Sequence, residues 1–165
     1  MNSKRITLLM FFIFLFSACA SNSQSRSEIF VWAKLITDLE KILESEILEA
    51  QSLMETIKLR PPNDYEYQQL VDYSDRFANL YNEIITIEPP EEARSAHNKF
   101  SERYAKTADY MRYYVLAIQM NDLNYFDKSV LAVQDANRIG EEANYQFKQL
   151  LEKYSISCDE LDYCQ

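Results

Sequence analysis

The segment from residue 28 reads Glu28-Ile-Phe-Val-Trp-Ala-Lys-Leu-Ile-Thr-Asp-Leu-Glu-Lys-Ile-Leu43, and its pattern continues to Lys58. Apolar residues return in it every three, four or seven positions, the period of a helix with one buried face. The residues on this stripe are Trp32, Ile36, Leu39, Leu43, Ala50, Leu53 and Ile57. The stripe covers about three positions in seven, which is typical of a bundle helix rather than a two-stranded coiled coil.

Three more segments with the same period follow, over residues 63–88, 91–120 and 124–154. The breaks between the segments are short: Pro61-Pro62, Pro89-Pro90 and Asn121-Asp122. Asn63 and Glu66 have the spacing of a capping box at the start of the second segment. Short connections make consecutive helices antiparallel. The sequence therefore predicts an all-α fold, an up-down-up-down antiparallel four-helix bundle over residues 28–155.

Composition supports this fold and excludes several functions. The chain has 165 residues and a single Gly, so folds rich in tight turns and Gly-rich phosphate or dinucleotide loops are excluded. Its formal net charge of −9 argues against binding to nucleic acid or to anionic lipid headgroups. An acidic surface of this kind most simply keeps a protein soluble.

The single glycine, Gly140, falls on the predicted inner face of the fourth helix, where that face becomes small and polar. The predicted stripe is Phe126, Val130, Val133, Asn137, Gly140, Asn144, Phe147, Leu151 and Tyr154. Counting outward from the turn near residue 122 pairs facing positions of the third and fourth helices. The pairs are Gly140 with Tyr104, Asn137 with Thr107, and Asn144 with Phe100. Two interpretations stay open: the Tyr104 ring fills the gap at Gly140, or Tyr104, Asn137, Gly140 and Asn144 line a small ligand site.

The N-terminus predicts export. Lys4 and Arg5 precede an apolar run from Ile6 to Phe16, the pattern of a signal peptide, and eleven helical residues are too short to cross a membrane. Leu15-Phe16-Ser17-Ala18-Cys19 then resembles the lipobox of bacterial lipoprotein precursors. That resemblance implies transfer of a diacylglycerol to the Cys19 sulfur and cleavage after Ala18. The alternative is an ordinary signal that is cleaved after Ala20 and discards Cys19.

These patterns divide the chain into a signal peptide at 1–18, a lipidated Cys19 with a flexible Ser-rich tether at 19–27, the bundle at 28–155, and a C-terminal tail at 156–165. The tail contains the two other cysteines, Cys158 and Cys164. In an oxidising compartment such a pair most simply forms a disulfide; free thiols or a metal pair are the alternatives.

No motif for catalysis, metal binding or a cofactor is found. The only histidine, His97, lacks the Glu-x-x-His spacing of di-iron bundles, because Arg94 stands three residues before it. We expect a half-buried, hydrogen-bonded His97. The twelve tyrosines either fill the edges of the bundle or form an aromatic contact surface.

Ile87-Glu-Pro-Pro-Glu-Glu-Ala-Arg-Ser-Ala-His97, followed by the fourth helix and a cysteine soon after it, resembles stretches of small exported helical proteins of unassigned function. Together, these features predict a lipid-anchored, non-enzymatic binding or structural module of the bacterial cell envelope, held at the cell membrane or outer membrane by Cys19. Its partner would be a protein, a peptide or a small ligand, and not a nucleic acid. The alternative is a metal- or cofactor-binding bundle, or an enzyme, centred on His97 and the polar inner face of the fourth helix.

Overall fold

The structure is a computed structural model that describes the backbone of residues 3–57 and 60–162, and the side chains of residues 24–57 and 60–162. Across these ranges the chain is helical and contains no strand. Its long helices are α1 (Ser3–Ile57), α2 (Asp64–Ile84), α3 (Arg94–Met120) and α4 (Leu123–Lys153). Two 3-10 helices, η1 (Glu91–Ala93) and η2 (Asp159–Leu161), precede α3 and follow α4. The predicted all-α class is confirmed.

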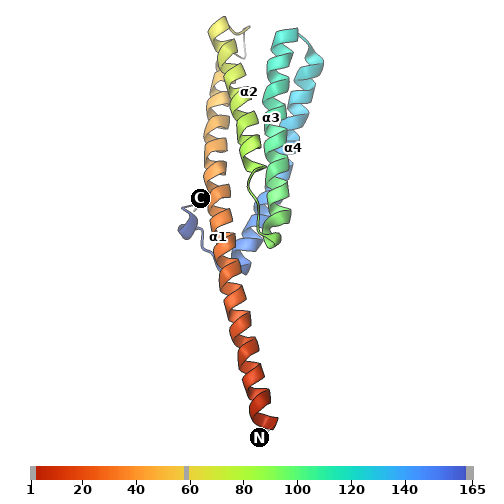
Figure 1. Cartoon of the computed structure of the whole chain (residues 1–165). Helices are drawn as coiled ribbons and strands as arrows, with labels where there is room; N and C mark the ends of the chain where they lie inside the picture. The colour runs from red at the N-terminus through yellow and green to blue at the C-terminus, as the bar shows by residue number, and fades with distance from the viewer. Residues whose placement is uncertain (1–2, 58–59, 163–165) are drawn as a thin grey trace.

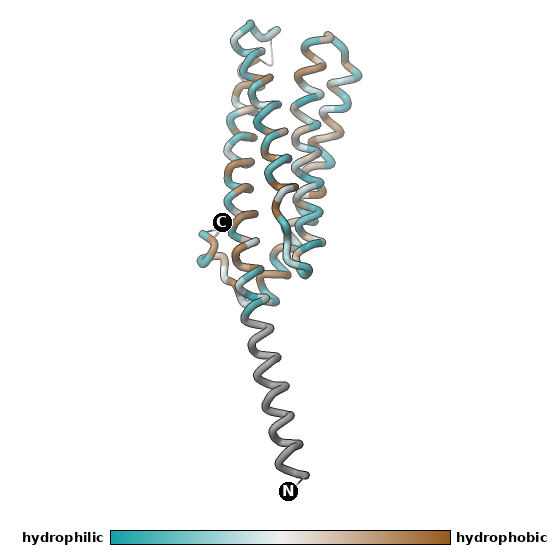
Figure 2. The backbone as a smooth tube through the Cα atoms, in the orientation of Figure 1, coloured by the Kyte–Doolittle hydropathy of each residue, from teal (hydrophilic) through white to brown (hydrophobic). Residues whose placement is uncertain are grey.

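The four long helices pack against one another as a bundle (Figure 1). The contact between α3 and α4 is the most extensive, and α2 packs against both α1 and α3. Apolar and polar residues alternate along each helix of the bundle (Figure 2), because each helix has one face toward the core. The largest fully buried side chains come from all four helices and the tail: Ile29, Ile36, Leu43, Leu70, Phe77, Ile84, Phe100, Tyr104, Met111, Ile139, Phe147 and Leu161.

Helix α2 begins at the predicted capping box. The Asn63 side chain accepts a hydrogen bond from the Glu66 amide at 2.9 Å, and the Glu66 carboxylate accepts one from the Asn63 amide at 2.9 Å. Arg60 adds two hydrogen bonds to the same carboxylate. The Arg60 guanidinium and the Asn63 amide lower the pKa of Glu66 to about 2. At its other end, α2 stops at Ile84, well before the Pro89-Pro90 pair that was expected to end it.

The helix that contains the first apolar stripe begins earlier than predicted. Residues 24–27 belong to the segment predicted as a flexible tether, but they are helical and part of α1. Arg26 forms an ion pair with Glu160 at 2.9 Å and a hydrogen bond to the Ser155 carbonyl. These contacts join the segment to the part of the chain that follows α4.

Helix α4 is rotated relative to the prediction. Its buried residues are Ser129, Ala132, Ala136, Ile139, Gly140, Ala143, Phe147, Leu150 and Leu151. Phe126, Val130 and Asn137, which were predicted to point inward, are exposed. The small alanines face α3 because they allow α4 to approach it closely. The Ser129 hydroxyl also donates a hydrogen bond to the Tyr110 carbonyl of α3 at 3.1 Å. A pattern based on the larger apolar residues therefore chose the wrong face in the first half of α4, whereas Gly140, Phe147, Leu151 and Tyr154 of the predicted stripe are buried.

The segment after α4 is part of the folded domain up to the last described residue. Leu161 of η2 is completely buried and Ile156 is 5% exposed. Element η2 packs against α1, and Glu160 accepts hydrogen bonds from Ser157 and Arg26. Among the described residues, no helix is both long enough and apolar enough to cross a membrane.

Candidate functional site

A pocket lies where α1 continues past the end of α2. Arg76 of α2 forms an ion pair with Glu46 of α1 at 2.8 Å, and one helical turn away the Tyr73 hydroxyl donates to Glu49 at 3.3 Å. Extending this register places Ile84, the last residue of α2, about level with Leu39. The part of α1 that precedes Leu39 therefore has no α2 beside it. The connection from α2 to η1 covers it instead, and it does so incompletely.

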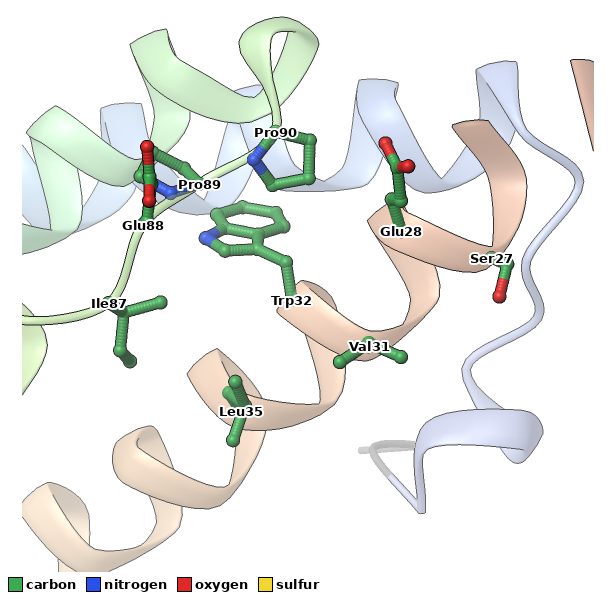
Figure 3. A pocket seen from close by; sticks show the side chains of 9 residues that line it. All are labelled: Ser27, Glu28, Val31, Trp32, Leu35, Ile87, Glu88, Pro89 and Pro90. Carbon is green, nitrogen blue, oxygen red and sulfur yellow. The ribbon is translucent and has the colours of Figure 1, made fainter. Parts of the chain in front are cut away.

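The space left there is a pocket of about 450 Å³, a volume within the range of about 300–1,000 Å³ typical of ligand sites (Figure 3). Its lining residues are Ser27, Glu28, Val31, Trp32 and Leu35 of α1, and Ile87, Glu88, Pro89 and Pro90 of the connection. Trp32 is only 2% exposed and forms the floor, whereas Val31 is 57% and Leu35 47% exposed. The walls are thus apolar and open to solvent.

Trp32 is fixed by His97, which lies behind the pocket on α3. The indole N–H donates to His97 Nδ1 at 3.4 Å, and the two rings meet edge to face with centroids 6.4 Å apart. His97 Nε2 lies 3.5 Å from the Ser101 hydroxyl. Nδ1 accepts a hydrogen bond in this arrangement and therefore carries no proton, so the imidazole is neutral with its proton on Nε2. Burial lowers the pKa of His97 and favours this neutral form.

Two carboxylates flank the apolar walls. Glu28 projects from α1 and Glu88 from the connection, and Figure 3 shows them on different sides of the indole. Within the described part of the chain, neither carboxylate forms an ion pair, although Glu28 accepts a hydrogen bond from Gln24 at 3.1 Å. None of the described residues that line the pocket is basic. The site therefore combines an apolar floor and walls with two negative charges at its rim.

A second polar feature lies in the core between α1, α3 and α4. Arg103 of α3 donates to the carboxylate of Glu40, whose side chain is 3% exposed. The other Glu40 oxygen, the Tyr104 hydroxyl and the Thr37 hydroxyl are buried without a hydrogen bond of good geometry. Burial raises the pKa of Glu40, and the nearby Arg103 and Tyr104 oppose that rise. The pKa of Tyr104 is raised by burial and by the adjacent carboxylate of Glu40.

Arg103 also explains the single glycine. A Cβ atom at Gly140 would lie 3.0 Å from both Cδ and Nε of Arg103. The Arg103 side chain therefore passes over α4 at Gly140, where no side chain stands between it and Glu40. The prediction that the Tyr104 ring packs on Gly140 is wrong by one residue. Neighbouring residues on a helix point about 100° apart, so Tyr104 faces Glu40 while Arg103 faces Gly140.

The four residues predicted as a ligand or packing site do not form one cavity. Tyr104 and Gly140 are buried on either side of Arg103, and Asn137 is exposed on the outside of α4. Asn144 is half-buried and lines a different groove, of about 500 Å³, together with Glu44 of α1. The rotation of α4 that exposes Asn137 separates these residues.

The predictions for the cysteines stay predictions. The side chain of Cys19 and the whole of Cys164 lie outside the described residues, as do the side chains of residues 1–18, the predicted signal peptide. Cys158 lies one residue before η2 and lines the groove that contains Asn144. Among the described residues, no group of three or more His, Cys, Asp or Glu side chains is arranged to hold a metal ion.

Sequence reasoning missed both the pocket and the Glu40–Arg103 pair. Glu40 lies three or four positions from Ile36 and Leu43, so the helical period alone could have marked it as a charge on the buried face. The pocket left no comparable signal, because it depends on where α2 ends. Comparisons of the chain with protein-family models, with curated proteins and with solved structures gave no match.

Proposed function

We propose that this protein is a lipid-tethered binding module of the bacterial cell envelope, built as an up-down-up-down antiparallel four-helix bundle. Diacylglycerol on Cys19 is the anchor, the bundle is extracytoplasmic, and Cys158 and Cys164 form a disulfide in its tail. The observation that carries the binding function is the open apolar pocket over Trp32. It forms because α2 ends at Ile84 and leaves this part of α1 uncovered. A packed structural domain has no need of an unfilled, apolar-walled pocket.

The cross-helix pairs support the antiparallel order. From α3 to α4 they are Tyr110 with Ser129, Lys106 with Asp135, and Lys99 with Glu142. The residue numbers rise on one helix as they fall on the other. From α1 to α3 the pairs are Trp32 with His97 and Glu40 with Arg103, and here the numbers rise together. Both trends are those of a chain whose helices alternate in direction.

The position of the pocket suits a tethered protein. Ser27, the first lining residue, is eight positions after Cys19, and this stretch spans at most about 28 Å even when extended. The pocket would therefore face partners close to the lipid surface. The Arg26–Glu160 ion pair joins α1 to the tail one residue before Ser27, beside the pocket.

Membrane association tests the anchor. Full-length protein expressed in a bacterial host should be found in the membrane fraction and be released by detergent but not by high salt. The Cys19→Ser variant should lose this association, and Cys158→Ser should keep it. Equal distribution of wild type and Cys19→Ser between the fractions would contradict the proposal.

Metal analysis separates the proposal from the alternative of a metal- or cofactor-binding bundle. Nδ1 of the neutral His97 accepts a hydrogen bond from the Trp32 N–H. The lone pair of Nδ1 is therefore not free to bind a metal ion. We expect purified protein to carry no stoichiometric metal. A stoichiometric metal that is lost in His97→Ala would overturn the proposed function in favour of the alternative.

A further inference from the structure

We propose that the pocket over Trp32 binds a short peptide segment of a partner protein, in which a lysine or arginine lies next to large aliphatic or aromatic side chains. This rests on the proposed function, because it names the ligand class of the same pocket.

The first argument is the shape of the missing wall. The pocket occupies the place where α2 would have continued along α1, from Leu35 back to Ser27. Eight residues of helix measure about 12 Å, which matches two helical turns or three to four extended residues of a second chain. A bound segment of this length would replace the missing part of α2 and cover the exposed side chains of Val31 and Leu35.

The second argument is charge. Glu28 and Glu88 lie at the rim, and two described cations on the same part of α1 are already paired: Lys34 with Asp38, and Arg26 with Glu160. The two carboxylates would repel an anionic ligand. A ligand with a cation next to an apolar side chain would pair the cation with the rim carboxylates and pack the apolar side chain against the walls. The net charge of −9 increases the rate of encounter with a basic partner.

A lipid acyl chain is the competing occupant, because the pocket lies close to the anchor and its walls are apolar. The two rim carboxylates disfavour an anionic lipid headgroup at this position. A hydrocarbon chain would also leave both carboxylates without a cation. The rim charges thus favour the peptide.

Trp32 is the only tryptophan in the chain, so its fluorescence reports on this pocket alone. The experiment titrates full-length protein in uncharged detergent with the blocked peptide Leu-Lys-Leu-Lys-Leu. The matched peptides are Leu-Glu-Leu-Glu-Leu, which reverses the charge, and Ser-Lys-Ser-Lys-Ser, which removes the apolar side chains. A separate titration uses phosphatidylcholine vesicles.

We expect a saturable change in Trp32 emission with the first peptide only. The double variant Glu28→Gln/Glu88→Gln should weaken the affinity at least about threefold, the effect of losing two exposed ion pairs. The matched variant Glu141→Gln, which removes an exposed charge on α4, should leave it unchanged. Circular dichroism of each variant confirms the fold; these side chains are exposed, so their substitution should not disturb it.

Several results would overturn the inference: no saturable change, equal binding of the acidic peptide, or an affinity unaffected by the rim variant. A saturable response to the vesicles without one to the peptide would assign the pocket to lipid. Membrane association of wild type together with any of these results contradicts the ligand class but not the tether. Peptide binding by a protein that is not membrane-associated contradicts the tether but not the ligand class.

Discussion

Substitution of Gly140 by Ala should destabilise the bundle, although Ala is the better helix former. In a helix interior the change from Gly to Ala is worth about 1 kcal/mol in favour of Ala. Against this, the new Cβ would lie 3.0 Å from Cδ and Nε of Arg103. These atoms are in the middle of the side chain, so they cannot move aside without shifting the guanidinium that pairs with Glu40.

The cost of that shift can be worked from burial. The side chains of Glu40 and Arg103 are 3% and 16% exposed, so the pair is buried. Breaking a buried pair costs about 3–5 kcal/mol, because a charge stays in the core without its partner. A contact of 3.0 Å is relieved by a shift of a few tenths of an ångström, so complete loss of the pair sets the upper bound. After subtraction of the helix gain, Gly140→Ala should lower the free energy of unfolding by up to about 4 kcal/mol. At about 2–4 °C per kcal/mol for a domain of this size, Tm should fall by up to roughly 16 °C.

Thermal unfolding followed by circular dichroism measures this, and a double-mutant cycle isolates the cause. In the background Glu40→Gln/Arg103→Ala the long side chain and the buried charge are both gone. There, Gly140→Ala should raise stability by up to about 1 kcal/mol. The reasoning is refuted if Gly140→Ala stabilises the parent protein, or if it destabilises both backgrounds equally.

Three further predictions concern the tail, the start of α2 and His97. Leu161→Ala should lower the free energy of unfolding by about 2–5 kcal/mol, because Leu161 is completely buried. The control Leu123→Ala, at an 80% exposed position, should change it by less than about 0.5 kcal/mol, and equal effects would mean that the tail does not pack against the bundle. The pKa of Glu66 is lowered from 4.5 to about 2, so its contribution to folding stability is complete above pH 4.5 and is lost as the pH falls toward 2. The difference in Tm between wild type and Glu66→Gln should shrink over that window, and a constant difference would count against the Arg60–Glu66 pair. Burial lowers the pKa of His97 below 6.5, so the contribution of His97 to stability is complete above pH 6.5 and declines at lower pH. The slope of the unfolding free energy against pH should be steeper for wild type than for His97→Gln in that range. Identical slopes would contradict a buried neutral His97.

Much of the helical architecture follows from sequence alone. The helical period places one stripe on the third helix, and its first six members are buried, whereas its last two are half-buried. The eight residues, in order, are Ala93, Ala96, Phe100, Tyr104, Thr107, Met111, Tyr114 and Ile118. The capping box at Asn63 and Glu66 was also predicted, because a cap depends on residues within one turn. Such features are local, and the helical period and side-chain chemistry suffice to find them.

The orientation of α4 and the site required the structure. The buried face of α4 is made by Ser129, Ala132 and Ala136, and small residues give a weak apolar signal although they allow the closest helix contact. The Arg103–Glu40 pair joins residues 63 positions apart, which no local pattern specifies. The pocket depends on α2 ending at Ile84, before the prolines that marked its expected end. Element boundaries of this kind are set by tertiary contacts.

The anchor is the part of the account on which the proposed location and function rest. The intact mass of the protein extracted from membranes tests it most directly. We predict a chain that begins at Cys19 and carries the additional mass of a diacylglycerol, with Cys158 and Cys164 two hydrogens lighter than their reduced forms. A chain without acyl mass that begins at Ser21 would contradict the account, because the bundle would then have no tether to a membrane.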